Sequence, residues 1–232
     1  MAKTIDLRSA LGPVRNQGPF RGTCLAFAIT TAHEHQRNDT DTLSVETLYW
    51  GAKEIDGDTA SGTTFTSADQ ALRNWGQPPE HMWPYDILRD DQHPSYIPPP
   101  EAIDPNACHF AALDAAKIDP AAITDLLDAG LIVAIGTPTW RGLSNPIGSR
   151  LTNPPASDLD GGHHAMVIVG YRTDTNEVLL RNSWGISWGE QGHAWIPFAF
   201  ITDHVVAART IASIHYRTEP QHADFSLEAV YR

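Results

Sequence analysis

The chain of 232 residues is acidic, with 28 Asp and Glu residues against 16 Lys and Arg and a formal net charge of -12. Its basic residues are scattered, which argues against a nucleic-acid partner, because phosphates require clustered cations. No run approaches the roughly 18 apolar residues of a membrane-spanning helix, and the first residues lack the apolar core of a signal peptide. We therefore expect a globular protein with no membrane partner; the sequence indicates nothing about oligomeric state.

Two cysteines, Cys24 and Cys108, allow one disulfide at most. A reducing cytoplasm is the simplest location for such a chain. Cys108 has no motif around it and is typical of a buried core thiol. We therefore predict a cytoplasmic protein without a disulfide framework.

The first half predicts helices separated by irregular connections. Apolar residues recur at helical spacing from Cys24 to about Arg37. Another helix is predicted to open within residues 43–50, with Ser44 as its N-cap. A third is predicted over 67–75 and is ended by Gly76.

The pattern changes after the Pro-rich stretch at 94–105, which predicts a surface loop or linker. A short helix is expected at 121–129, followed by strand-like apolar runs at 131–135, 165–169 and 177–181. We therefore predict one α+β domain over 1–232, with a mainly helical lobe at about 1–105, a β-rich lobe at about 106–217 and a polar tail at 218–232. A cleft between two lobes is a natural place for an active site.

Cys24 follows a loop that contains Gly and Pro, and it opens the first predicted helix. A thiol attacks well only as thiolate, and both the positive end of a helix and a nearby imidazolium lower its pKa. His164 could supply that imidazole and then protonate a leaving amine. Asn182 could orient the ring through its side-chain oxygen. Gln17, together with the backbone N–H of Cys24, could donate to an oxyanion.

Plainer interpretations stay open for several of these residues. Gln17 could be an ordinary loop residue, and Asn182 could satisfy a turn. Adjacent histidines on a strand point to opposite faces, so only one of His163 and His164 can face the cysteine; His163 either edges the cleft or is exposed to solvent. His33 and His35 resemble a metal-binding pair, but side chains two residues apart point in different directions on a helix, so a solvated helix face is favoured. We expect no metal and no organic cofactor.

Several segments, in this order, resemble the papain-like cysteine peptidases: Pro13-Val14-Arg15-Asn16-Gln17-Gly18, Leu43-Ser44, His164-Ala165 followed by Val169-Gly170-Tyr171, and Asn182-Ser183-Trp184-Gly185 with Trp188-Gly189-Glu190-Gln191-Gly192. His164 lies 140 residues after Cys24, inside the window of about 130–150 that is typical of this family. Asn182 lies 158 residues after Cys24, slightly beyond that window. The resemblance covers about Asp6 to Ile201. It implies a two-lobed papain-like fold with a helical N-terminal lobe, an antiparallel β-barrel-like C-terminal lobe and a cleft between them.

The resemblance also implies roles for individual residues. Cys24 matches the nucleophile, His164 the general acid and base, Asn182 the orienting residue and Gln17 the oxyanion donor. The residues expected to bind substrate are Gly62 and Thr63, which stand where the family has Gly-Gly, together with Phe65, His163, Trp184 and Trp188.

The sequence departs from the family pattern in several respects. Gln17 precedes Cys24 by seven residues where six is usual, and Leu25 replaces an aromatic residue. The disulfide cysteines of secreted members are missing. An inhibitory pro-region is also absent from this sequence, so restraint is external or a pro-segment lies outside it.

We therefore expect a cysteine endopeptidase that hydrolyses protein or peptide substrates through a Cys24 thioester, with His164 as acid and base. Two alternatives stay open. The altered loop after Gln17 suggests a catalytically impaired pseudopeptidase that binds peptides. The same Cys–His pair would also serve an acyl transferase that passes the acyl group to an amine instead of water.

Overall fold

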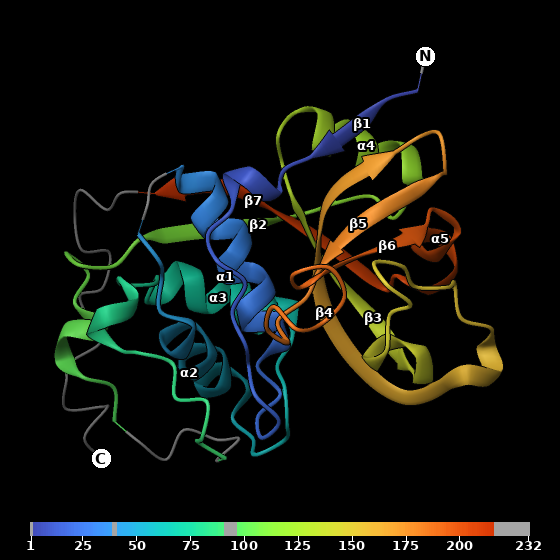
Figure 1. Ribbon diagram of the computed structural model, residues 1–232. Helices are drawn as coiled ribbons and strands as arrows, with labels where there is room; N and C mark the ends of the chain where they lie inside the picture. The colour runs from blue at the N-terminus through green and yellow to red at the C-terminus, as the bar shows by residue number, and fades with distance from the viewer. Residues whose placement is uncertain (1, 39–40, 91–96, 216–232) are drawn as a thin grey trace.

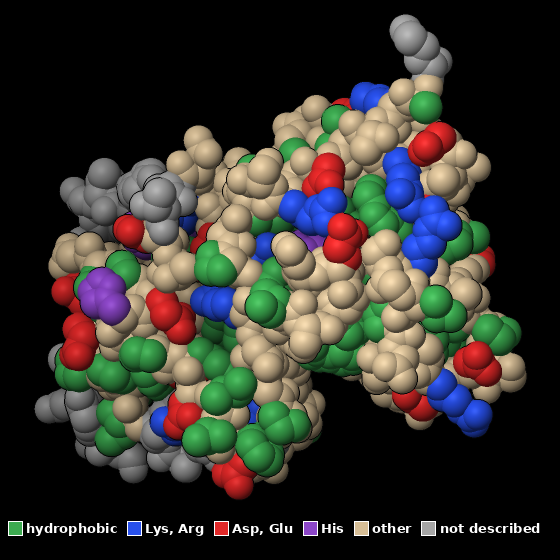
Figure 2. All heavy atoms as spheres, viewed as in Figure 1, with side chains coloured by type: hydrophobic (Ala, Val, Ile, Leu, Met, Phe, Trp, Pro, Cys, Tyr) green, Lys and Arg blue, Asp and Glu red, His purple; other side chains and the backbone are tan. Residues whose placement is uncertain are grey.

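The computed structural model describes residues 2–38, 41–90 and 97–215. The predicted tail at 218–232 and residues 94–96 of the predicted linker lie outside these ranges. Within them, the three longest helices gather on one side of the molecule and most of the strands on the other, with the first helix at the junction (Figure 1). In the space-filling view the two halves form separate bulges with a notch between them at the lower edge (Figure 2). In these ranges, no helix combines the length and apolar character that crossing a membrane requires.

Three helices form the helical half: α1 (Cys24–Arg37), α2 (Val45–Asp56) and α3 (Phe65–Asn74). As predicted, Ser44 caps α2, and its hydroxyl accepts a hydrogen bond of 3.1 Å from the backbone of Thr47. The backbone after α3 enters the left-handed region at Gly76, where φ is +69°. A Cβ at Gly76 would lie 2.7 Å from the carbonyl of His109, so a glycine ends this segment for two reasons.

The second half is built on one antiparallel sheet. Its strands are β1 (Thr4–Asp6), β2 (Phe110–Ala115), β3 (Val133–Trp140), β4 (Leu159–Arg172), β5 (Glu177–Arg181), β6 (His193–Pro197) and β7 (Ala207–His215). They follow the order β2-β7-β3-β4-β5-β6, and β1 pairs with β4. Two short helices, α4 (Pro120–Asp128) and α5 (Ala199–His204), complete this half. The predicted α+β class is confirmed.

The central strand β4 separates two apolar clusters. Its Ala165 and Val167 belong to the cluster shared with α1, α2 and α3, whereas Met166 and Ile168 belong to the cluster that contains residues of α4 and α5. Burial on both faces explains why the sequence of β4 is continuously apolar here instead of alternating.

The first strand lies apart from the helices that follow it in the sequence. Thr4–Asp6 pairs with β4 in the sheet, with Ile5 opposite Tyr171. A Cβ at Gly170 would lie 2.4 Å from the carbonyl oxygen of Ile5, so this close pairing depends on a glycine. The range of about 1–105 expected for the helical lobe therefore includes one strand of the sheet.

Candidate active site

Cys24 is the first residue of α1 and is partly exposed. Its side chain packs against the apolar cluster that includes Ala165 of β4. The backbone N–H of Ala165 favours the thiolate, and so do the N–H groups of Cys24 and Leu25 at the helix start. The structure therefore brings the thiol beside the residue that follows His164.

Burial dominates the ionisation of both groups of this candidate pair. It raises the pKa of the Cys24 thiol above its ordinary value and outweighs the backbone N–H groups, contrary to the expected lowering. It also lowers the pKa of His164 to about 4, although the hydrogen bond to Asn182 acts in the opposite direction. Burial disfavours each charge alone, and an opposite charge nearby offsets that cost. Burial therefore favours the neutral thiol and the neutral imidazole, and a thiolate would form here by passing its proton to the His164 ring.

His164 is fixed by Asn182, which follows β5. The ring Nε2 donates to Asn182 Oδ1 over 2.7 Å, and the backbone N–H of Ser183 donates to the same oxygen over 2.8 Å. Because an amide oxygen only accepts, Nε2 carries the proton, and Nδ1 is the basic nitrogen of the neutral ring. The Trp184 ring lies over this contact, with its centroid 4.7 Å from that of the imidazole. Asn182 can therefore orient the imidazole in a site largely shielded from water.

His163 precedes His164 on β4 but is exposed, whereas His164 is buried. In the ladder with β3, His163 lies opposite Pro138, and His164 lies opposite Thr137. Neighbouring residues of a strand point to opposite faces. Only His164 therefore combines burial with the Asn182 contact.

Gln17 is buried, and its carboxamide is oriented by Ser183. The side-chain Oε1 accepts from Ser183 Oγ over 2.7 Å, and the backbone N–H donates to the Ser183 carbonyl over 2.8 Å. Its Nε2 donates to the carbonyl of Arg21 over 3.3 Å. A primary amide has two N–H donors, so one stays available for an oxyanion. Tyr85 donates to the Gln17 carbonyl over 2.8 Å and holds the backbone of the same residue.

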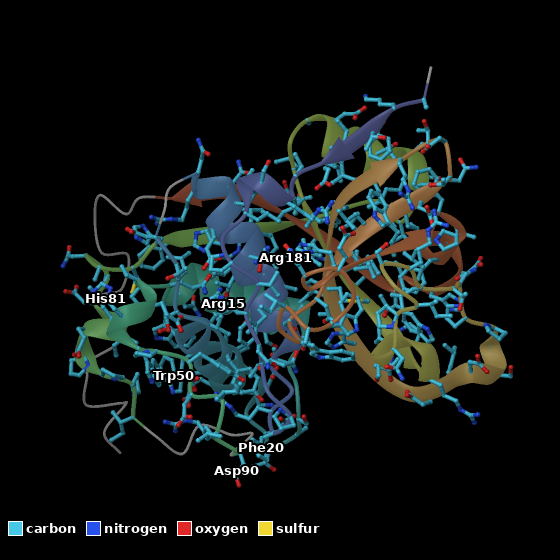
Figure 3. The ribbon with its side chains drawn as sticks, viewed as in Figure 1. Arg15, Phe20, Trp50, His81, Asp90 and Arg181 are labelled. Atoms are coloured by element: carbon cyan, nitrogen blue, oxygen red, sulfur yellow. The ribbon has the colours of Figure 1, made fainter. Side chains whose placement is uncertain are left out.

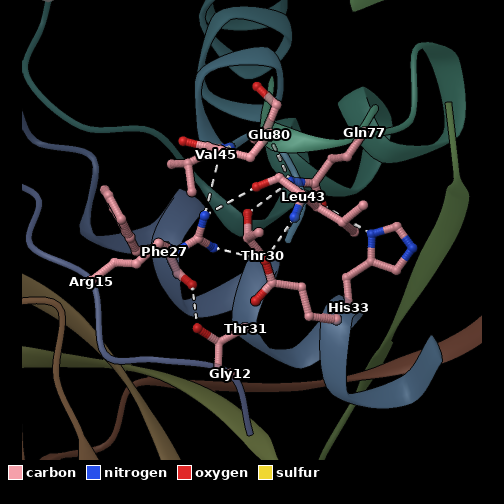
Figure 4. Close-up of polar contacts among 12 residues, drawn as sticks. Gly12, Arg15, Phe27, Thr30, Thr31, His33, Leu43, Val45, Gln77 and Glu80 are labelled. Atoms are coloured by element: carbon pink, nitrogen blue, oxygen red, sulfur yellow. Dashed lines mark hydrogen bonds and ion pairs between the residues drawn. The ribbon is translucent and has the colours of Figure 1, made fainter. Parts of the chain in front are cut away.

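The segment just before Gln17 is held from both halves of the molecule. Arg15 pairs with Glu34 of α1 over 3.0 Å and donates to the carbonyl of Leu43 over 3.1 Å (Figure 4). Arg181 of β5 donates to the carbonyls of Gly12 and Pro13 over 2.8 and 2.7 Å. Both arginines lie near α1 at the junction of the halves (Figure 3).

Three of the residues expected to bind substrate lie at or just before the start of α3. Gly62, with φ of +87°, faces Gly22, where a Cβ would lie 2.5 Å from the Gly62 nitrogen. Thr63 follows, and its hydroxyl is buried without a hydrogen-bond partner in the part of the chain that the structure describes. Phe65 begins α3 and reaches the sheet half, because its ring edge lies 3.3 Å from the Cβ position of Gly136 on β3. The Arg209 guanidinium carbon lies 5.4 Å from the Phe65 ring centroid.

The two tryptophans differ in exposure. Trp184 is half-buried beside His164, whereas Trp188 is buried and meets Trp184 edge-on, with ring centroids 6.2 Å apart. The indole N–H of Trp188 donates to the carbonyl of Leu143 over 2.8 Å. Trp188 therefore supports Trp184 from behind.

Two residues of this site were not predicted. Ser183 stands inside the Asn182-Ser183-Trp184 motif, which was the available signal, but its contact with Gln17 joins segments 166 positions apart. Tyr85 lies in an irregular segment, and its two contacts, with the carbonyl of Gln17 and the hydroxyl of Thr23, depend on the tertiary fold.

The other cysteine has a different environment. Both cysteines are free; Cys108 is buried, and burial raises its pKa to about 12. Its thiol lies 3.5 Å from the carbonyl of Ala102. Across residues 2–38, 41–90 and 97–215, no three His, Cys, Asp or Glu side chains gather as a possible metal site.

Known proteins similar to this chain are cysteine peptidases. The sequence model of the family described as papain family cysteine protease matches residues 150–206, a range that contains His164 and Asn182 but not Cys24. The chain is 26% identical to an uncharacterized peptidase C1-like protein of Acanthamoeba polyphaga mimivirus, over 90% of this chain and 71% of that protein. It is also 26% identical to cathepsin L of Sarcophaga peregrina, over 82% of this chain but only 57% of that relative.

Solved structures share the fold. Xylellain, a cysteine protease from Xylella fastidiosa, superimposes with a TM-score of 0.80 at 23% identity, covering 91% of this chain and 86% of that one. The Carica candamarcensis cysteine protease CMS1MS2, solved in complex with E-64, gives a TM-score of 0.67 at 23% identity, covering 90% of this chain and 97% of that one. The family model, the relatives and the solved structures thus all point to one family that this chain resembles, the papain-like cysteine peptidases.

Proposed function

We propose that this chain is a cysteine endopeptidase in which Cys24 and His164 carry the chemistry. The observation that supports it most directly is the 2.7 Å contact between His164 and Asn182, covered by Trp184 and adjacent to Ala165, where the Cys24 thiol lies. This arrangement supplies a nucleophile, a base and a group that orients the base. The family resemblance supports peptidase activity in general, and protein or peptide substrates follow from it.

The proposed reaction has two steps. The Cys24 thiolate adds to the scissile carbonyl, and the resulting oxyanion accepts hydrogen bonds from Gln17 Nε2 and the backbone N–H of Cys24. The His164 imidazolium gives its proton to the departing amine, which leaves a thioester on Cys24. Neutral His164 then takes a proton from water as the water attacks the thioester. The acid is released and the thiol is restored.

An electrophilic epoxide probe tests this proposal, because the two cysteines provide an internal control. We expect stoichiometric labelling at Cys24 and none at Cys108, which is buried with a pKa raised to about 12. Cys24→Ala should lose both labelling and peptide hydrolysis, whereas Cys108→Ala should retain both. A wild-type protein that is labelled at neither cysteine and hydrolyses no peptide under reducing conditions would instead be a pseudopeptidase.

Product masses separate hydrolysis from acyl transfer. With peptide alone we expect the free acid, and an added amine should give only a minor amide product. A dominant amide product would identify an acyl transferase. A cytoplasmic location stays a prediction.

A further inference from the structure

The buried face of α2 carries two opposite charges. The side chains of Glu46 and Lys53 are each 1% exposed. They are seven residues apart, about two turns of an α-helix, and so lie on the same face. A buried charge is costly unless it is paired and hydrogen-bonded, so each must have a partner. The closest partner of each, Arg21 for Glu46 and Asp58 for Lys53, lies in a different loop.

Glu46 holds the loop between Gln17 and Cys24. Its carboxylate receives two hydrogen bonds from the fully buried Arg21 guanidinium, over 2.7 and 2.8 Å. The guanidinium also lies on the Tyr85 ring, 4.7 Å from its centroid. The backbone carbonyl of Arg21 is the one that accepts from Gln17 Nε2. Glu46 therefore acts on the proposed oxyanion donor through Arg21.

Lys53 holds the loop that ends at Gly62. Its ammonium group contacts Asp58 Oδ1 over 2.6 Å and the carbonyls of Ala60 and Gly62 over 3.0 and 3.2 Å. Asp56 Oδ2 lies 3.3 Å away on the same helix. Two backbone carbonyls of one short loop are thus fixed by one buried cation.

The two loops meet beside Cys24. A Cβ at Gly22 would lie 2.5 Å from both the Gly62 nitrogen and the Ser61 hydroxyl, so the backbones are in close contact. Gly22 lies two residues before Cys24. A shift of either loop would therefore move the backbone beside Cys24.

We propose that Glu46 and Lys53 are positioning residues that hold these two loops against each other. Glu46 sets the Gln17 carboxamide for the oxyanion, and Lys53 sets the Gly62–Thr63 edge for the substrate backbone. The inference rests on the proposed peptidase activity. It goes beyond that activity in assigning catalytic geometry to buried charges that touch neither substrate nor reacting atoms.

Glu46→Gln is the first test, because it keeps the shape and removes the charge. Glu177→Gln is the matched control: Glu177 is also buried in an ion pair, with Arg172 over 2.5 Å, but it lies on β5 in the sheet half. A misplaced catalytic group costs on the order of 100-fold in rate, and we expect kcat of Glu46→Gln to fall by about 10- to 100-fold. We expect Glu177→Gln to keep kcat within about threefold, because it lowers stability without moving the site.

Alkylation of Cys24 by iodoacetamide separates positioning from general damage. This reaction forms no oxyanion, so Glu46→Gln should slow acylation by peptide substrate while leaving the alkylation rate within about threefold. Equal falls in both rates, or no fall in acylation, would overturn the proposal. If Glu46→Gln fails to fold, the double variant Arg21→Gln, Glu46→Gln removes the unpaired charge, and the same two rates are measured on it.

Lys53→Met tests the second loop. It keeps most of the side-chain volume but removes the charge. It should raise KM by about tenfold with a smaller change in kcat, because the Gly62–Thr63 loop that would face the substrate is no longer held. A fall in kcat with KM unchanged would contradict the assigned role.

Hydrogen exchange gives a readout that needs no turnover. Amides of residues 17–24 should exchange faster in Glu46→Gln and those of 58–63 faster in Lys53→Met, with neither changed in Glu177→Gln. Unchanged exchange in these loops would overturn the positioning roles. A wild-type protein that hydrolyses no peptide would refute the proposed function, while loop exchange would still decide whether these charges immobilise the loops.

Discussion

The two halves of the molecule hold their parts of the site by different forces. In the sheet half, the backbone ladder in which β4 pairs with β3 and β5 places His164 on β4 and Asn182 directly after β5. In the helical half, Gln17 and Gly62 lie in loops. Gln17 donates to the backbone carbonyl of Arg21, whose buried side chain is held by Glu46, and the carbonyl of Gly62 accepts from the buried Lys53. A ladder uses only main-chain atoms, whereas a loop needs particular side chains.

This difference predicts how each half tolerates substitution. The cluster around β3, β4 and β5 is apolar, and Ile135, Ile168 and Leu180 are fully buried in it. Truncation there leaves a cavity that costs about 2–5 kcal/mol of unfolding free energy while the strand register persists. Removing one partner of a buried ion pair leaves a charge without compensation and disturbs the loop that it held. Catalytic geometry should therefore be more sensitive to substitution in the helical half, and stability in the sheet half.

The largest expected effect concerns the adjacent histidines of β4. His164→Ala removes the proposed acid and base and should lower kcat/KM by about 10⁴-fold or more. His163→Ala, on the exposed face, should change kcat/KM by less than about tenfold and act mainly on KM. Steady-state kinetics of both variants check this. Comparable losses in the two would show that the ladder does not select between them as the register indicates.

Gln17→Ala should produce the next largest effect. Loss of one oxyanion donor costs about 10²- to 10³-fold in kcat, and KM should change little because the donor acts in the transition state. Ser183→Ala is a milder variant for comparison, because it removes the 2.7 Å hydrogen bond that orients Gln17 Oε1 but keeps the Gln17 amide. Its kcat should fall between those of the wild type and Gln17→Ala. A Gln17→Ala variant with wild-type kcat would mean that Gln17 does not donate to the oxyanion, because the extra residue between Gln17 and Cys24 displaces its amide.

Much of this fold could be predicted from the sequence. The helices at Cys24–Arg37 and from Val45 have apolar faces or a cap, and both occur where expected. The strands β1, β2, β6 and β7 were not predicted, because their pairing depends on the tertiary fold; β1 with β4 and β2 with β7 join segments far apart in the sequence. Four residues of the site (Cys24, His164, Asn182 and Gln17) were candidates because motifs surround them; their catalytic roles stay predictions.

The rest of the site could not be predicted for a physical reason. Glu46 and Lys53 have the sequence signature of an ordinary solvated helix, since charged residues are usually exposed. Only the tertiary structure shows that their face of α2 turns inward. Likewise, the raised pKa of Cys24 follows from burial, whereas the sequence showed only the helix start that acts in the opposite direction.

Acid should destabilise the sheet half through its buried histidines. Burial lowers the pKa of His164 and of His193 from 6.5 to about 4. Between these values the unfolded chain binds more protons than the folded one, so stability falls as the pH drops from 6.5 towards 4. Each histidine contributes on the order of 3 kcal/mol to this loss. Urea unfolding at pH 7 and pH 4.5 measures it, and His193→Gln should remove about half of the change; an unchanged pH dependence in that variant would contradict the assignment.

The smallest expected effect compares two helix caps, one in each half. Ser44 caps α2 and also donates to the carbonyl of Trp83 over 2.7 Å, whereas Asp119 caps α4 by accepting from Ala122 over 3.1 Å. Substituting either by Ala should cost about 1 kcal/mol of unfolding free energy. Ser44→Ala should also lower kcat by about two- to fivefold, because fraying at the start of α2 loosens Glu46 and hence Arg21. Asp119→Ala should leave kcat unchanged, since α4 lies behind the sheet. Equal kinetic effects at equal loss of stability would show that the site responds to global stability. The proposed difference between the helical half, held by buried ion pairs, and the sheet half, held by backbone pairing, would then be wrong.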